Sequence, residues 1–367
     1  MQTTAPITNW TSIACSADGS KVVATAVGGF PGNVGPIYLS TNSGVTWSQA
    51  TAPIANWDSV ASSADGTKLV ASGYQSVYLS PDSGATWAPV SGVSGRRVVS
   101  SADGMQLFLS DGFRSTNSGA SWTPVPGGGW VIASSADGTK LVSAYFNNNG
   151  FPMGCICVST NSGTTWTQTS APLYSWTGWT ALASSADGRK LAATIGYTSF
   201  PTGPGPIFIS PDGGGTWLAS SSPTSHWTAA ACSADGTRLV ATTLFAGIYI
   251  STDSGATWAS NNAPITNWSA VACSADGMKL VAVVDGGGIW TAQSTPSPLL
   301  SITPSPTNVV LSWTVPSARF ALQENSDLVT TNWTEVAMTP VLNLTNLQNE
   351  VRLSPVTGNR FYRLKGQ

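Results

Sequence analysis

Acid–base chemistry in this chain would depend on very few side chains. The first 320 residues contain 13 aspartates and a single histidine, His226, but no glutamate. Ten of these aspartates fall in two repeated motifs, both typical of turns in which a carboxylate accepts backbone hydrogen bonds. Asp58, Asp111 and Asp285 lie outside the motifs. They are the catalytic candidates if the chain is an enzyme, because a glycoside hydrolase needs two carboxyl groups about 5–10 Å apart.

Aromatic, amide and cationic side chains recur near the same place in most repeats. A tryptophan stands eight residues before the motif aspartate at Trp10, Trp57, Trp179, Trp227 and Trp268, and seven residues before it at Trp130. Further candidates lie beside these positions or at Phe-Pro loop tips: Asn9, Asn56, Asn267, His226, Arg96, Arg97, Phe30, Phe151 and Phe200. Indoles that stack on sugars, together with amides, suit a shallow binding site. Alternatively, the tryptophans wedge between neighbouring sheets and the Phe-Pro tips pack as lids.

The elements that carry these residues are repeats. Ser-Ala-Asp-Gly occurs seven times, with its aspartate at positions 18, 65, 103, 137, 187, 235 and 276. The mean spacing is about 43 residues, which is the length of a four-stranded propeller blade. In the first repeat, residues 10–16 and 21–26 have the composition of buried strands, and the motif between them forms a turn. Four short antiparallel strands per repeat predict an all-β chain folded as a seven-bladed β-propeller.

A second motif follows six of the seven copies. It reads STNSGVTW at residues 40–47, and the five similar octapeptides end at Trp87, Trp122, Trp166, Trp217 and Trp258. This motif resembles the Asp-box, or BNR repeat, of sialidase-like β-propellers, and the resemblance covers residues 1–293. It implies that these turns lie on the face opposite the usual ligand site. The propeller part lacks the glutamate and the Arg-Ile-Pro element that sialidases require, which argues against sialidase activity.

The two ends of the repeat region predict how the ring closes. The seventh repeat has no Asp-box and no clear fourth strand, whereas residues 2–10 (QTTAPITNW) parallel residues 49–57 (QATAPIANW). We therefore expect the N-terminal segment to supply the outer strand of the last blade, which removes two open edges. With this strand order, the connections between blades and the second-to-third-strand loops share one face. This upper face is expected to hold the three remaining aspartates and the ligand-binding candidates.

The composition changes after residue 293. Residues 294–299 are typical of a linker, and residues 300–367 contain the segments LSWTV, RFALQENSD and RFYRLK. This segment resembles the small β-sandwich that ends many secreted proteins of Verrucomicrobia and Planctomycetes. The resemblance implies a fibronectin-III-like accessory domain that has no activity of its own.

Composition and cysteine use exclude several functions. A net charge of −2, with 9% charged residues, provides no basic surface for nucleic acid. The sequence also contains no run of about 18 apolar residues, which a membrane-spanning helix would need. Cys15, Cys232 and Cys273 share a repeat position with serine, which favours packing. Cys155 and Cys157 lack a second pair of ligands, so no metal or other cofactor is expected. The sequence shows no signal peptide, but its low charge and its C-terminal segment favour a bacterial protein that is secreted or at the cell surface, with its leader removed.

These observations predict a secreted, non-catalytic, monomeric binding protein whose upper face recognises a glycan or a peptide. The first alternative is a polysaccharide-acting glycoside hydrolase that uses Asp58, Asp111 or Asp285, and a protein without catalytic activity is favoured over this enzyme. The second alternative is a structural module of the cell surface.

Overall fold

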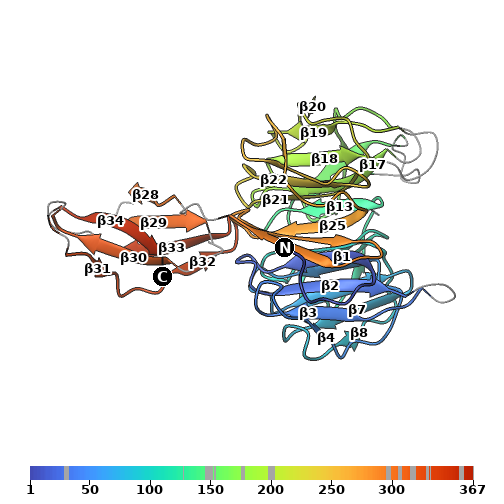
Figure 1. Ribbon diagram of the computed structural model, residues 1–367, viewed down its shortest axis with the longest axis horizontal. Coiled ribbons are helices and arrows are strands. Elements are labelled where there is room, and N and C mark those ends of the chain that lie inside the picture. The colour runs from blue at the N-terminus through green and yellow to red at the C-terminus, as the bar shows by residue number, and fades with distance from the viewer. Residues whose placement is uncertain are drawn as a thin grey trace.

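The computed structural model is built from β-strands, and no helix occurs among the residues that it describes (Figure 1). These residues are 1–28, 33–126, 128–144, 152, 154–174, 178–196, 203–294, 299–304, 308–314, 320–327, 330, 332–354 and 359–366. In this described part of the chain, no helix is long and apolar enough to cross a membrane.

Each of the first three repeats forms a four-stranded antiparallel sheet. The first sheet contains β1 (Asn9–Cys15), β2 (Val22–Val27), β3 (Ile37–Ser40) and β4 (Ser48–Gln49). The second contains β5 (Ser59–Ser62), β6 (Leu69–Gly73), β7 (Ser76–Ser80) and β8 (Ala88–Pro89). The third contains β9 (Val98–Ser100), β10 (Leu107–Leu109), β11 (Phe113–Ser115) and β12 (Thr123–Pro124).

The later repeats follow the same strand order. The fourth sheet contains β13 (Val131–Ser134), β14 (Leu141–Ala144), β15 (Ile156–Ser159) and β16 (Thr167–Gln168). The fifth contains β17 (Trp179–Ser184), β18 (Leu191–Ile195), β19 (Ile207–Ser210) and β20 (Leu218–Ala219). The sixth contains β21 (Trp227–Cys232), β22 (Leu239–Thr243), β23 (Ile248–Ser251) and β24 (Ala259–Ser260), and the last has three strands, β25 (Trp268–Cys273), β26 (Lys279–Val284) and β27 (Ile289–Gln293).

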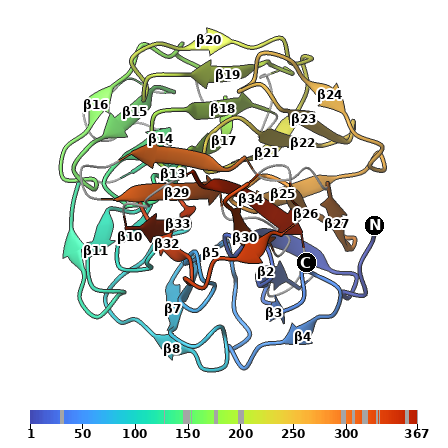
Figure 2. The same ribbon diagram turned by 90° about the vertical axis from the view of Figure 1, so that its left-hand side faces the viewer.

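The alanines of the Ser-Ala-Asp-Gly motifs tie these sheets into a closed ring around one axis (Figure 2). The backbone N–H of each alanine donates to the carbonyl of the alanine in the next repeat, over 2.6–2.8 Å. The chain of donors runs through Ala17, Ala64, Ala102, Ala136, Ala186, Ala234 and Ala275, and the last N–H donates back to Ala17. Because every inner strand is held by its two neighbours, the sheets radiate from the axis in the β-propeller arrangement.

The N-terminal residues lie along the outer edge of the three-stranded sheet. Gln2 pairs with Trp290 in antiparallel orientation, and the N–H of Thr3 donates to the carbonyl of Ile289 over 2.8 Å. Residues from the two ends of the repeat region therefore share one sheet, and β27 has a partner on its outer side.

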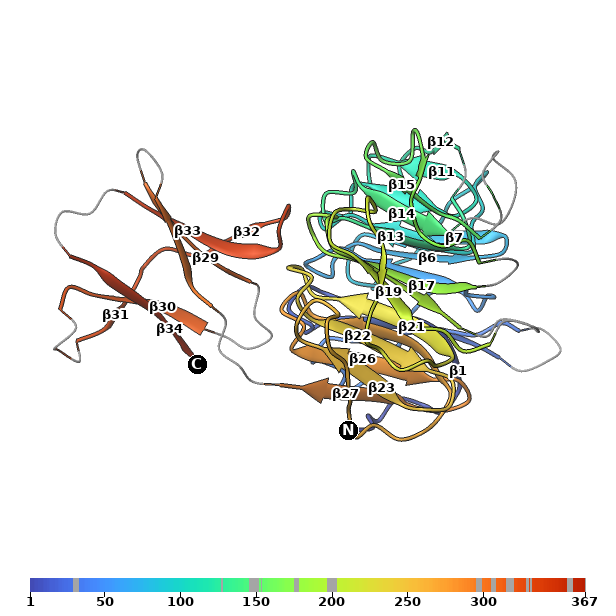
Figure 3. The same ribbon diagram turned by 90° about the horizontal axis from the view of Figure 1, so that it is seen from above.

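Two more sheets follow the ring (Figures 1 and 3). One has the order β28 (Ser301–Pro304), β29 (Val309–Thr314), β33 (Gln348–Leu353) and β32 (Val341–Asn343). The other has the order β31 (Thr334–Glu335), β30 (Phe320–Asn325) and β34 (Phe361–Gly366). Leu311 and Trp313 of the first sheet share a buried cluster with Leu322 of the second, so the two sheets pack against each other.

The turn between β32 and β33 reaches the axis of the ring. Leu342 and Leu347 pack against the buried cluster that the motif alanines form there. In Figure 2 these C-terminal strands lie in front of the centre of the ring. The side of the ring that carries the Ser-Ala-Asp-Gly turns is therefore covered at its centre, whereas the upper face lies on the other side.

Candidate functional site

The face of the ring opposite the upper face, here called the lower face, carries the Ser-Ala-Asp-Gly turns, whose polar groups hydrogen-bond within the turn. In the first repeat, Asp18 accepts hydrogen bonds from the Ser16 hydroxyl (2.6 Å) and from the N–H of Ser20 (2.9 Å). Burial raises the pKa of Asp18, but these hydrogen bonds outweigh it and hold the pKa below its ordinary value. The same balance lowers the pKa of Asp65, Asp137, Asp187 and Asp235. These carboxylates are structural acceptors.

The second motif forms an equally self-contained turn. Asp82 accepts hydrogen bonds from the N–H of Thr86 (2.8 Å) and from the Thr86 hydroxyl (2.6 Å). In another copy Asn42 accepts the corresponding backbone bond from Thr46 (2.9 Å), which explains why asparagine can replace aspartate. Bonds from the Thr257 hydroxyl and N–H lower the pKa of Asp253 to about 2. The motif aspartates therefore have no free role in catalysis.

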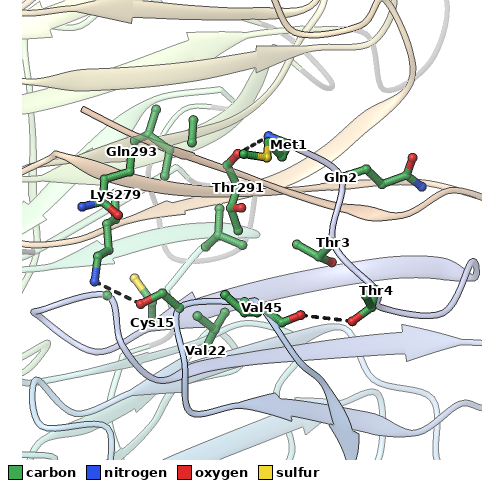
Figure 4. Close-up of a pocket in the computed structure, with 16 residues that line it drawn as sticks. Met1, Gln2, Thr3, Thr4, Cys15, Val22, Val45, Lys279, Thr291 and Gln293 are labelled. Atoms are coloured by element: carbon green, nitrogen blue, oxygen red, sulfur yellow. Dashed lines mark hydrogen bonds between the residues drawn. The ribbon is translucent and has the colours of Figure 1, made fainter. Parts of the chain in front are cut away.

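A large cavity also opens on this side of the ring, between the last sheet and the first (Figure 4). Its volume is about 620 Å³, and its walls include Val22, Val45 and Leu280 together with the N-terminal residues. Its cation, Lys279, already donates to the carbonyl of Asp18 (3.2 Å) and to the hydroxyl of Ser43 (3.0 Å). Size alone does not make this cavity a reaction site, because no carboxylate lines it.

The repeated tryptophans are buried between the sheets and offer no face to a ligand. Their side chains are 0–3% exposed at Trp10, Trp57, Trp179, Trp227 and Trp268. Three of their indole N–H groups are bound to glycine carbonyls, as at Trp227 and Gly205 (2.8 Å). We therefore remove these five residues from the ligand-binding set that the sequence predicts. The wedge alternative describes their packing.

The remaining sequence candidates have mixed positions. Asn9, Asn267 and His226 are half-buried and Asn56 is exposed. The backbone carbonyls of two of these residues fix neighbouring loops. That of His226 accepts a hydrogen bond from the N–H of Leu244 and that of Asn267 accepts one from the N–H of Asp285, both over 2.9 Å. Phe30, Phe151 and Phe200 lie outside the described residues.

One cluster on the upper face combines aromatic rings with a cation. The guanidinium carbon of Arg96 lies 5.1 Å from the ring centre of Tyr74 and 5.3 Å from that of Trp130. Both rings are more than half exposed, at 58% for Tyr74 and 57% for Trp130. Such contacts hold the arginine through the attraction between a cation and an aromatic face. Within the described part of the chain, its guanidinium N–H groups have no hydrogen-bond acceptor.

The loops of three neighbouring sheets bring this cluster together. Tyr74 lies in the tight turn between β6 and β7, Arg96 precedes β9, and Trp130 precedes β13. In the third repeat Gly95 takes the place of the repeated tryptophan, and an added Cβ there would lie 2.7 Å from the Leu109 side chain. The loss of the wedge tryptophan in this repeat therefore places an arginine, not an indole, at the rim of the ring.

Two carboxylates and a second arginine lie beside the cluster. Arg97 donates to the backbone carbonyl of Asp58 over 3.2 Å, and Asp111 accepts from the hydroxyl of Ser110 over 3.1 Å. Burial raises the pKa of Asp58. The positive charges of Arg96 and Arg97 lower this pKa and the negative charge of Asp111 raises it, and the net shift is upward. The pKa of Arg97 is lowered because burial removes surrounding water, and the nearby Asp58 opposes this shift in part. Asp285 belongs to the turn between β26 and β27, in another sheet.

Cys15 and Cys232 are unreactive because of their positions. Burial, together with the nearby charges of Asp18 and Asp235, raises the pKa of Cys15 and of Cys232 to about 12. A thiol with so high a pKa stays protonated at neutral pH and is a poor nucleophile. The sulfurs of Cys155 and Cys157 are 3.5 Å apart, where they share a hydrogen bond and form no disulfide. Among the described residues, no group of three or more potential ligands could hold a metal ion.

Comparison with solved structures identifies the class of fold. YCF48 bound to D1 peptide superposes with a TM-score of 0.58 at 14% identity, covering 81% of this chain and 96% of that one. A GH74 xyloglucanase from Xanthomonas campestris gives 0.58 at 18% identity, covering 86% of this chain and 59% of that one. Hydrazine synthase from Kuenenia stuttgartiensis gives 0.61 at 14% identity, covering 81% and 98%. These neighbours are β-propellers, and so is the ring of this protein.

The likeness does not extend to sequence. No protein-family profile matches the chain, and no curated protein is detectably similar to it. At such low identities the structural neighbours share the fold alone. The function has to be argued from the upper-face cluster.

Proposed function

We propose that the protein is a non-catalytic binding protein whose upper face recognises a glycan or a peptide through Tyr74, Arg96 and Trp130. The observation that carries this proposal is the arginine held between two exposed aromatic rings. Tyr and Trp provide large, rigid contact surfaces, and arginine provides several N–H donors in a fixed plane. Among the residues that the structure describes, no acceptor is bound to these donors, which leaves them available to a ligand.

The chemistry of the cluster fits either kind of ligand. A sugar ring can stack on Trp130 or Tyr74 while its hydroxyl groups accept bonds from Arg96. A peptide can place a carbonyl, a carboxylate or an aromatic side chain against the same groups. The structural neighbours support both readings, since one was solved with a bound peptide and another acts on a glycan.

A specific observation keeps hydrolysis as the second candidate function. The pKa of Asp58 is raised, and Asp111 is near enough to contribute to that shift. A carboxyl group with a raised pKa beside a second carboxyl group is the kind of pair that glycoside hydrolysis uses. This candidate needs only Asp58 and Asp111, because Asp285 lies in a different sheet.

The architecture that we propose around this site is a seven-bladed Asp-box propeller with a C-terminal fibronectin-III-like β-sandwich. The ring of seven alanine hydrogen bonds and the internal turns of the second motif support the first part. The core that β29 and β30 share supports the second. We further propose that the protein is secreted or held at the cell surface, where a glycan or peptide ligand would be met.

Binding to glycan and peptide arrays tests the proposal directly. The wild type is compared with Arg96→Ala, and Phe245→Ala serves as a matched control. Phe245 is an equally exposed aromatic residue (64%) in a second-to-third-strand loop, but no arginine stacks on it. We expect Arg96→Ala to lose at least ten-fold in affinity for a ligand that the wild type binds, and Phe245→Ala to keep it. Equal losses in both variants, or none in either, would show that the cluster is not the site.

The hydrolase candidate has its own assay. Purified protein is incubated with polysaccharides that bind on the array, and newly formed reducing ends are measured. Turnover that disappears in Asp58→Asn and in Asp111→Asn would replace the binding-only proposal. Turnover that survives both substitutions would not come from this pair of carboxylates.

A further inference from the structure

Each copy of the second motif is tied to the Ser-Ala-Asp-Gly turn of its own repeat by one backbone hydrogen bond. The fourth residue of the motif donates its N–H to the carbonyl of the residue that follows Ser-Ala-Asp-Gly, over 2.6–3.0 Å. In five copies the donor is a serine with a positive φ of 54–60°, and the acceptor residue is Ser20, Thr67, Met105, Thr139 or Thr237. The fifth copy has Gly213 as the donor and Arg189 as the acceptor. Two contacting positions therefore depart from the repeat together.

The serine of this motif position has a second partner in the groove between neighbouring sheets. In three grooves the ammonium group of a lysine from the preceding repeat donates to the serine hydroxyl over 3.0–3.1 Å, as Lys190 does to Ser254. The corresponding lysine between the fourth and fifth sheets is Lys140, which donates to the carbonyl of Asp187 over 2.6 Å. Glycine at position 213 provides no hydroxyl for it. Among the described residues, no second acceptor is bound to Lys140.

A cavity of about 180 Å³ opens at this place, between the fourth and fifth sheets (Figure 2). Lys140, Arg189 and Gly213 border it, and four apolar side chains form much of its wall: Leu141, Val142, Val158 and Leu191. The apolar residues are buried or half-buried, whereas Arg189 is exposed, so the cavity is apolar inside and cationic at its opening. An apolar cavity of about 150 Å³ accommodates a benzene-sized molecule. A small ligand therefore fits this one.

The polar groups around the cavity offer donors, because its acidic groups are already bound. Asp212, which lines the cavity, accepts from the N–H and the hydroxyl of Thr216 over 2.8 and 2.9 Å. Asp187 accepts from the Ser185 hydroxyl over 2.6 Å. In contrast, no acceptor within the described part of the chain is bound to the guanidinium group of Arg189. A ligand for this site must supply acceptors, and the two oxygens of a carboxylate match the paired N–H groups of an arginine.

We propose that this cavity binds a small monocarboxylate with a compact apolar body, such as benzoate. The carboxylate pairs with Arg189 and Lys140, and the apolar body lies against the walls of the cavity. The two cations balance the charges of Asp187 and Asp212, so an anion is not repelled. In the next groove Thr237 stands in place of the arginine and Ser254 in place of the glycine, so neither the second cation nor the opening is present there.

The proposal is tested with 4-fluorobenzoate as the probe. Its binding to the full chain is followed by fluorine NMR, and its displacement gives the affinities of unlabelled competitors. We expect saturable binding and competition by benzoate. Benzamide has the ring without the negative charge and acetate has the charge without the ring. Each should bind about ten-fold more weakly than benzoate, or weaker still.

Restoring the repeat pattern should remove the site. Gly213→Ser adds the hydroxyl that binds the lysine in other grooves, and it occupies the opening. Arg189→Thr introduces the residue that stands at this place in three other copies. Each variant should bind 4-fluorobenzoate about ten-fold more weakly or worse. Both residues are accommodated in the other copies, so both variants should fold, which thermal unfolding checks. Ser254→Gly, the reverse exchange in the next groove, is the matched control and should leave the affinity unchanged.

The measurements are repeated with Arg96→Ala, because the upper-face cluster also contains an arginine beside aromatic rings. We expect the probe to bind this variant as well. Binding that depends on Arg96 would assign the probe to the upper face and overturn the proposal without contradicting the proposed function. The proposal is also overturned if the probe does not bind at millimolar concentration, if benzamide competes as well as benzoate, or if folded Gly213→Ser or Arg189→Thr binds as the wild type does. Equal losses in Gly213→Ser and Ser254→Gly would show an effect of the turns and contradict a site in this cavity.

Discussion

Replacing Trp57 with alanine should destabilise the protein strongly, whereas replacing Trp130 should not. Trp57 is fully buried, packs edge-on against Tyr78 at 5.6 Å, and shares a cluster with Val60 and Leu69. Truncation of a buried tryptophan leaves a cavity and costs about 3–5 kcal/mol. Trp130 is 57% exposed and contacts Arg96, so its truncation removes mainly an exposed cation–π contact of about 0.5–1 kcal/mol.

Urea unfolding at pH 7, followed by far-UV circular dichroism, measures both effects in the full chain. The free energy of unfolding is compared among wild type, Trp57→Ala and Trp130→Ala, with the denaturant slope checked for constancy. A loss for Trp130→Ala as large as that for Trp57→Ala would contradict the assignment of one tryptophan to the core and the other to the site. A decrease of less than about 1 kcal/mol in the free energy of unfolding of Trp57→Ala would equally contradict the burial of this side chain in the core.

Three further predictions concern charge and the C-terminal sheets. Because the net pKa shifts of Asp58 and Asp65 have opposite signs, Asp58→Asn should raise the urea midpoint at pH 7 and Asp65→Asn should lower it; shifts in the same direction would contradict this. The lowered pKa values of turn carboxylates such as Asp253, at about 2 against an ordinary 3.8, mean that their contribution is complete above about pH 4 and is lost as the pH falls toward 2. These carboxylates should therefore leave the urea midpoint constant between pH 7 and pH 5 and should lower it below pH 4, while Asp58 has the opposite effect. A midpoint at pH 2.5 equal to that at pH 7 would contradict the role of the turn hydrogen bonds. Finally, changing Leu342 and Leu347 to serine should free the C-terminal sheets from the axis of the ring, which solution X-ray scattering would detect as a larger radius of gyration; an unchanged radius would show that this contact does not hold them.

The propeller could be predicted from the repeats because each repeated motif is compatible with one local structure. Ser-Ala-Asp-Gly places a small residue, an acceptor and a residue with positive φ in order, and Gly19 has a φ of 65°. The parallel between residues 2–10 and 49–57 likewise predicted a contact that the pairing of Gln2 with Trp290 shows. Repetition is informative about scaffold because every copy must satisfy the same packing.

The same reasoning explains why five of the six tryptophans that the sequence predicts for the ligand site are buried instead. The sequence places these five tryptophans after the connection between blades, where an inner strand begins, but in four repeats a register shift follows the tryptophan, for example between Trp227 and Ala229. A β-bulge changes the direction of a side chain, and its presence cannot be read from residue types alone. No such shift is found in the pairing of β13, which follows Trp130, or of β5, which follows the buried Trp57, so the shift alone does not decide burial. Trp130 is also one place out of register with the other tryptophans in sequence, which was the available signal.

Tyr74 was missed for a different reason. It occupies a short loop with no counterpart motif, and an isolated exposed tyrosine does not indicate a site. Its role emerges only from the ring closure that sets three consecutive repeats side by side and brings Tyr74 to Arg96. The proposed site thus lies where a repeat departs from its pattern, at Gly95 and Arg96, and not at the positions that recur.

A structure of the complex would show whether the upper-face cluster of Tyr74, Arg96 and Trp130 binds the ligand. A glycan or peptide that binds on the arrays is soaked into crystals of the full chain. We expect ligand density in contact with the rings of Tyr74 and Trp130, with an acceptor within hydrogen-bonding distance of the guanidinium group of Arg96. Density at any other place, with this cluster unoccupied, would contradict the account.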